Sequence, residues 1–244
     1  MLFNRIPSPQ TFDFFIEGEV ETATVRWNKQ AKRIIIHIDP YSGAVLITLP
    51  KGAKIAEAKK FLQSKIKWIT DARKGITQEK PLQHGSILSL YGKEHTVVFL
   101  DVGPRKVTVF QDGNIHYIKV GGPASHAPKR LVGWLKDLAR THLTEAATAH
   151  AETLGVSFNA IRIGDTKSRW GSCSARGNLN FSWRLILAPA SVLNYVAAHE
   201  VAHLIEMNHS AAFWREVEKC VPNWEMERKW LRKNGGHLMA QARL

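Results

Sequence analysis

The residues best suited to chemistry are two histidines and a glutamate in the run His199-Glu200-Val201-Ala202-His203. Residues four positions apart lie on one face of a helix, so the imidazoles of His199 and His203 can bind one metal ion together. Glu200 lies about 100° further round the helix. From there its carboxylate would reach a water molecule on the metal more easily than the metal itself. This spacing is typical of sites in which two histidines bind zinc and a glutamate acts as general base.

A third histidine, His209, follows six residues after His203. Asn208 favours the left-handed conformation that ends a helix, so we expect the chain to turn back there and bring His209 to the open side of the metal. Three imidazoles leave a fourth position for water, as in catalytic rather than structural zinc sites. The predicted cofactor is one Zn²⁺ per chain, although another divalent transition metal also suits these ligands. The alternative is that these are core and surface histidines without a ligand role.

The helix that must position the first two histidines is predicted to begin after Pro189 and Ser191. Val192 and Val196 lie on the helical face that continues into His199 and His203. This pattern predicts that the two histidines face the interior of the protein.

Further motifs surround this helix in a specific order. They are Arg169-Trp170-Gly171-Ser172-Cys173-Ser174, Trp183-Arg184-Leu185-Ile186-Leu187-Ala188-Pro189, Tyr195-Val196, His199-Glu200-Val201-Ala202-His203-Leu204, Asn208-His209-Ser210 and Phe213-Trp214. Together they resemble the YgjP-like metallopeptidase family, which is similar to the WLM and SprT-like zinc peptidases, all of them small zincins. The resemblance implies that the three histidines bind zinc and that Glu200 is catalytic. It extends in part to the N-terminal half, through Arg33 and the residues around Trp68.

The resemblance predicts a zinc-dependent metallopeptidase in which Glu200 takes a proton from a zinc-activated water. Two alternative functions remain open, one using the same metal site and one suggested by the basic charge of the chain. One is a nucleotide pyrophosphatase of the UTP type. The other is a SprT-like, DNA-associated protease or a basic nucleic-acid-binding module. The net charge of +13 and the pI near 9.9 favour an anionic substrate, a nucleic acid or an acidic protein as partner. They do not choose among a peptide, a protein and a nucleotide substrate.

Three residues near the predicted crevice are candidates for substrate binding: Arg169, Trp170 and Arg184. Either arginine could bind an anionic group or a developing oxyanion, and the alternative for each is a structural ion pair. Trp170 is more typical of packing around the site than of stacking on a substrate. Cys173 invites a nucleophile hypothesis, but no supporting order of acid and base is present. Its segment is expected to be a small-residue turn or an extended strand.

The lysine-rich stretch from Lys51 to Lys74 contains Trp68. On a helix it would form either an anion-binding face or, by default, a solvated surface.

No window of the chain is apolar enough to span a membrane, and the first residues do not resemble a signal peptide. With only two cysteines, Cys173 and Cys220, and no disulfide framework, a reducing cytoplasm is the expected compartment. The oligomeric state is not encoded in these patterns.

The predicted fold class is α+β, with two domains divided at Gly121-Gly122-Pro123. Residues 1–122 are predicted to form a β-rich N-terminal domain with one helix at 55–74. Residues 123–244 are predicted to form a helical, zincin-like metallohydrolase domain with a small sheet. We find no internal repeat. The expected strands are 22–27, 33–38, 44–49, 87–90, 96–100, 107–110, 115–118, 156–163 and 178–183; the other expected helices are 128–154, one from about 190 to 207, one beginning at 210, and one from 223 to 234.

Overall fold

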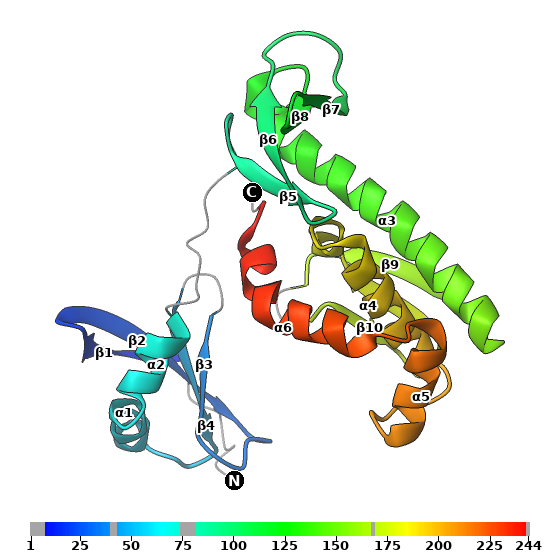
Figure 1. Cartoon of the computed structure of the whole chain (residues 1–244). Helices are drawn as coiled ribbons and strands as arrows, with labels where there is room; N and C mark the ends of the chain where they lie inside the picture. The colour runs from blue at the N-terminus through cyan, green and yellow to red at the C-terminus, as the bar shows by residue number, and fades with distance from the viewer. Residues whose placement is uncertain (1–7, 40–42, 74–81, 167–168, 243–244) are drawn as a thin grey trace. The chain divides into compact units, whose positions relative to one another are not determined.

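The computed structural model describes residues 8–39, 43–73, 82–166 and 169–242. It contains three small sheets and a set of helices, which confirms the α+β class (Figure 1). The chain divides into two compact units, Met1–Glu79 and Lys80–Leu244, and each is described by itself. In the described part of the chain, no helix is both long enough and apolar enough to cross a bilayer.

The first unit is a four-stranded sheet with two short helices. Alternating burial along the strands places one face of the sheet in a core with α1 and α2, because side chains on a strand point to opposite faces in turn. Phe14, Val25 and Ile47 lie in this core. The strand order is β1 (Gln10–Ile16), β2 (Glu19–Asn28), β4 (Val45–Pro50), β3 (Ile35–Ile38), and the helices are α1 (Ile55–Gln63) and α2 (Ile66–Arg73).

The prediction of a single helix over 55–74 is wrong, because the helix is interrupted after Gln63. The Ser64 hydroxyl donates to the carbonyl of Phe61 at 2.7 Å. A serine that bonds its own backbone in this way competes with the regular helical pattern. The apolar face nevertheless continues across the break, since Leu62 and Ile69 are both fully buried. Lys74 lies outside the described residues.

The second unit begins with another four-stranded sheet. Its order is β5 (Ile87–Leu90), β6 (Lys93–Phe99), β8 (Ile115–Val120), β7 (Val107–Asp112). In both four-stranded sheets the two outer pairs are antiparallel hairpins and the two central strands are parallel. The first hairpin of each sheet also closes through two left-handed residues, Glu17-Gly18 in one and Tyr91-Gly92 in the other. The two sheets therefore share a topology although their sequences show no repeat.

The predicted domain boundary at Gly121-Gly122-Pro123 lies inside the second unit, because strands β5 to β8 pack on the same core as the helices that follow. Leu90, Val97 and Ile118 of this sheet belong to one cluster with Leu135 of α3 (Ala127–Leu154). The short 3-10 helix η1 (Ala124–His126) leads directly into α3. As an assignment of separately folding domains, the division at 122 stays a prediction.

Helix α3 ends as the sequence predicts, with Gly155 in the left-handed conformation at φ 66°. A three-stranded sheet follows, in the order β10 (Gly171–Cys173), β11 (Asn178–Ser182), β9 (Ala160–Gly164), with β10 at its edge. Of the two alternatives for the segment around Cys173, the structure contains the strand. The chain then forms the 3-10 helix η2 (Trp183–Leu187), α4 (Ala190–Ala202), α5 (Ala211–Cys220) and α6 (Trp224–Ala240).

Two predicted helix ends are wrong. Helix α4 stops at Ala202, with His203 as its C-cap, instead of continuing to Met207-Asn208. Asn208 has no left-handed backbone; the turn is closed by bonds from the amides of Leu204 and Ile205 to carbonyls three residues earlier. Helix α6 continues past Gly235 to Ala240. A Cβ at Gly235 would lie 3.2 Å from the Trp170 ring, so this glycine allows close packing within the helix and does not end it.

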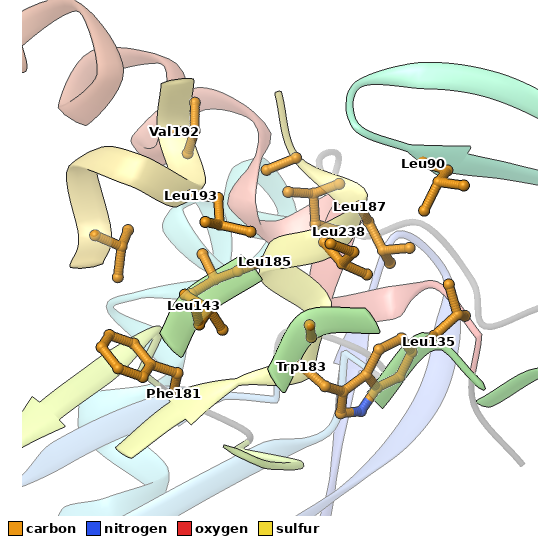
Figure 2. Close-up of a cluster of buried hydrophobic side chains, with 14 of the residues drawn as sticks. Leu90, Leu135, Leu143, Phe181, Trp183, Leu185, Leu187, Val192, Leu193 and Leu238 are labelled. Atoms are coloured by element: carbon orange, nitrogen blue, oxygen red, sulfur yellow. The ribbon is translucent and has the colours of Figure 1, made fainter. Parts of the chain in front are cut away.

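The core of the second unit surrounds η2 and the start of α4 (Figure 2). Trp183, Leu185 and Leu187 of η2 point into it and are fully buried. They meet Leu135 of α3 and Leu238 of α6 (Figure 2). Helix α4 is buried on almost all sides, as its mostly apolar sequence requires.

The β5–β6 hairpin holds the start of α4. The amides of Tyr91 and Gly92 donate to the carbonyls of Ile186 and Leu187, at 2.9 and 3.2 Å. Gly92 has φ 77°, and a Cβ at this position would lie 2.9 Å from Cγ of Pro189, the N-cap of α4. The turn therefore needs glycine for both its backbone conformation and its close approach to the helix.

We expect Gly92→Ala to lower the free energy of unfolding by about 2–4 kcal/mol, since left-handed strain is joined by a steric clash. Gly85→Ala is the matched control, because Gly85 has φ 81° but nothing within 4 Å of a Cβ. This variant should lose only about 1 kcal/mol. Urea unfolding of both proteins measures the difference. Equal losses would mean that Pro189 moves aside and the hairpin does not hold the helix.

Candidate metal centre

The three predicted histidines lie together at the end of α4. One nitrogen from each of His199, His203 and His209 can be chosen so that all three lie within 4.8 Å of one another. The Nε2 atoms of His199 and His209 are 3.0 Å apart. Zinc bound to imidazoles at about 2.0–2.1 Å requires ligand nitrogens roughly 3.3 Å apart in a tetrahedral site. The arrangement thus fits a small metal ion with little movement of the side chains.

The early end of α4 is what brings the third histidine back. His199 lies inside the helix and His203 caps it, while the turn at residues 203–206 reverses the chain within a few residues. The ring centres of His203 and His209 are 4.8 Å apart as a result. The chain reversal predicted from the sequence is present, although it occurs five residues earlier than Asn208.

Backbone contacts select the tautomer of His203. Its Nδ1 lies 3.0 Å from the carbonyl oxygen of Glu206, which can only accept a hydrogen bond. Nδ1 therefore carries the proton, and Nε2 keeps its lone pair for a metal. Nδ1 of His199 is buried without a partner in the described part of the chain.

Phe213 covers one side of the three histidines. Its ring centre lies 4.8, 4.5 and 4.7 Å from those of His199, His203 and His209, and its side chain is fully buried. The predicted N-cap at Ser210 positions this ring, since the Ser210 hydroxyl accepts from the Phe213 amide at 3.4 Å. An apolar wall of this kind keeps water away from one side of the histidines.

Burial in apolar surroundings favours the neutral form of the histidines. Burial, together with the charges of His203, His209 and Arg228, lowers the pKa of His199 to about 3. Burial also lowers the pKa of His203. Neutral imidazoles are the form that binds metal ions, so the chain keeps both of these histidines ready for coordination at neutral pH.

Glu200 directly follows His199 in α4 and is buried, with 5% of its surface exposed. Burial raises the pKa of its carboxyl to about 8, while the nearby Arg169 guanidinium acts in the opposite direction. Within the described residues, no donor forms a hydrogen bond to this carboxyl group. A buried acid without a structural partner is unusual and typical of a group that handles protons.

Gly171 of strand β10 provides the space for Glu200. A Cβ at this position would lie 2.5 Å from Oε1 and 2.6 Å from Cγ of Glu200. No other residue type fits there without moving the carboxyl group. The Arg169-Trp170-Gly171 motif is noticeable in the sequence, but the reason for its glycine becomes visible only in the packed structure.

The three candidates for substrate binding have different surroundings in the structure. Arg169 is exposed and close enough to Glu200 to affect its pKa. Arg184 is only 1% exposed, forms an ion pair with Asp165, and donates from Nε to the carbonyl of Gln241 at 3.1 Å. These contacts favour the structural alternative for Arg184. Trp170 is partly buried against Gly235, as expected of a packing residue.

Other chemically capable side chains have different roles. His142 bonds the hydroxyl of Tyr91 at 2.7 Å, and His150 bonds Asn194 at 2.9 Å, so both have polar partners away from the cluster. Burial raises the pKa of the Cys173 thiol, and the charge of Glu200 raises it further. A thiol held protonated is a poor nucleophile. This argues against a cysteine mechanism.

Comparisons with known proteins were consistent with this site. Residues 32–234 match the family model described as "YgjP-like, metallopeptidase domain". Among solved structures, the chain is similar to the metallopeptidase zymogen of Pyrococcus abyssi abylysin, with 24% identity over 37% of this chain and 93% of that chain. The TM-score of this match is 0.34. A search of curated proteins found no match.

We expect His199→Ala, His203→Ala and His209→Ala each to lose zinc, because two imidazoles bind the ion much less tightly than three. His142→Ala is the control, since this histidine is bonded to Tyr91 outside the cluster. Elemental analysis of the purified proteins measures zinc per chain. A parent-like zinc content in any of the three variants would remove that histidine from the ligand set.

Proposed function

Because the chain belongs to the YgjP-like metallopeptidase domain family, we propose that it is a zinc-dependent peptidase whose general base is Glu200. The proposed metal ligands are His199, His203 and His209. The observation that carries this proposal is the convergence of three imidazoles in the segment that also carries Glu200, a buried carboxyl group without a hydrogen-bond partner among the described residues. When bound, zinc would supply Lewis acidity for the attacking water and the peptide carbonyl.

Glu200 is suited to moving a proton during peptide hydrolysis. Its carboxylate accepts a proton from the attacking water and passes it to the nitrogen of the leaving amine. Because burial raises the pKa of this carboxyl group, its ionised form is a stronger proton acceptor than a solvated carboxylate. The contact with Gly171 limits the positions that the carboxyl group can take. The distance and angle between the Glu200 carboxylate and the reacting bond would therefore vary little.

The position of strand β10 supports a peptide as the substrate. It is the edge strand of its sheet, and its Gly171 lies directly against Glu200. An edge strand offers backbone donors and acceptors to an extended chain, which is a common mode of peptide recognition. A peptide bound along β10 would pass beside the proposed general base.

Arg169 is the proposed partner for negative charge that develops on the substrate. Its side chain is exposed, and its charge reaches Glu200. The same property favours a second candidate, a nucleotide pyrophosphatase, since a guanidinium also binds phosphate oxygens. Assays with casein and with UTP, each with and without a chelator, decide between the two substrates.

We expect Glu200→Gln to keep its zinc but to lose hydrolysis by about 10²–10⁴-fold, since the amide cannot accept the proton. Zinc content and the rate of casein cleavage are measured on the same preparation. Turnover at the parental rate would contradict the proposed role of Glu200.

Gly171→Ala tests the space beside Glu200. We expect zinc to remain bound and the rate to fall about 100-fold, because the added methyl group displaces the carboxyl group. Gly164→Ala is the control in the same sheet, since a Cβ at Gly164 has nothing within 4 Å. A Gly171→Ala protein as active as the control would show that the position of Glu200 is not critical.

A further inference from the structure

Helix α6 carries an arginine that stacks on a pair of tryptophans. Trp214 and Trp224 are parallel within 16°, with ring centres 4.1 Å apart. Cζ of Arg228 lies 4.8 Å from the ring centre of Trp214 and 5.8 Å from that of Trp224. A guanidinium over indole rings is attracted to their electron-rich faces. This contact limits the conformations of a side chain that would otherwise be mobile.

The stacked arginine lies next to the metal centre. Trp214 has its ring centre 5.7 Å from that of His199 and 5.8 Å from that of His209. Together with the 4.8 Å from Trp214 to Arg228, these distances place the guanidinium within about three extended residues of the histidines. The effect of its charge on the pKa of His199 is consistent with this short range.

Arg228 is not held in an ion pair by any residue of the described ranges, in contrast to two other arginines of the chain. Arg73 pairs with Glu21, and Arg184 pairs with Asp165. Arg228 is exposed and forms no ion pair with any residue of the described ranges. Stacking uses the face of the guanidinium, so its in-plane N–H groups remain oriented for a planar, bidentate acceptor such as a carboxylate.

We propose that Arg228 forms an anion subsite that binds a carboxylate of the peptide substrate, within about three residues of the cleaved bond. The carboxylate is either an acidic side chain or the free C-terminus. This inference rests on the proposed peptidase function and adds a preference for negatively charged peptides. The aromatic pair fixes the guanidinium before the substrate arrives, which reduces the entropy lost on binding.

Kinetics with matched peptides test the subsite. Six pairs of fluorogenic peptides carry Glu or Gln at one of the three positions on either side of the cleaved bond. A further pair ends in a free carboxylate or an amide. For the zinc-loaded parent we expect one acidic peptide to have a kcat/KM about fivefold higher than its neutral partner, mainly through KM. Arg228→Gln should remove this difference and leave the neutral peptide unchanged.

Arg232→Gln is the control, since Arg232 is an exposed arginine one turn further along α6. It should keep the preference for the acidic peptide. Arg228→Lys should keep part of it, because charge remains but the planar fork is lost. If Arg228→Gln and Arg232→Gln both keep the full preference, or if the parent cleaves acidic and neutral peptides equally well, the subsite assignment is wrong.

A binding measurement separates this inference from the peptidase proposal. Titration with N-acetylglutamate is followed by the fluorescence of the tryptophans, which requires no turnover. We expect the affinity of Arg228→Gln to be about fivefold lower than that of the parent and of Arg232→Gln. A protein that binds the probe through Arg228 but cleaves no peptide would contradict the peptidase and retain the subsite. Equal affinities, or an Arg228-dependent response to inorganic phosphate alone, would overturn the carboxylate assignment.

Discussion

The metal centre depends on ending a buried helix at one particular residue. Helix α4 is enclosed on almost all sides, so its direction is determined by packing. Because it stops at Ala202, the next residues reverse the chain and His209 returns to His199. One further regular turn would carry His209 roughly 5 Å along the helix axis and away from the other two imidazoles. Three imidazoles can meet only because the apolar helix and the tight turn adjoin.

The neighbouring acid shows how packing and chemistry are combined in this site. A buried carboxyl group costs free energy unless it is paired or protonated, and Glu200 has no hydrogen-bond partner among the described residues. The segments around Glu200 are otherwise apolar and densely packed, since Phe213 and η2 are fully buried in the core cluster of this unit. Gly171 then restricts the carboxyl group by simple contact. Packing contacts thus restrain the carboxyl group of Glu200, although it has no hydrogen-bond partner among the described residues.

Much of this arrangement follows from short-range sequence patterns. The alternation of apolar residues predicts strands β5 to β8, and the histidine spacing predicts the cluster, because both depend on the local periodicity of one element. The helix ends at Ser64 and His203, and the continuation of α6 through Gly235, are different. They depend on a hydroxyl that bonds backward, on a tight turn and on a tryptophan from another segment. Local propensity contains no information about such partners.

The same limit applies to the site. His199, His203, His209 and Glu200 can be found from their spacing, whereas Arg228 is one exposed arginine among many in the sequence. Its significance comes from Trp214 and Trp224, which belong to different helices. Arg184 is the opposite case. It has the sequence context of a site residue, but its partners Asp165 and Gln241 make it part of the scaffold.

The two four-stranded sheets share a topology, but their first hairpin turns differ in the substitutions that they tolerate. In each sheet the first hairpin closes through two consecutive residues in the left-handed conformation. A Cβ at Gly18 would have no atom within 4 Å, whereas a Cβ at Gly92 would clash with Pro189. The turn at Gly18 only connects two strands. The turn at Gly92 also packs against the start of α4, the helix that carries His199. Substitution is therefore far more restricted at Gly92 than at Gly18, although the two turns share one backbone conformation.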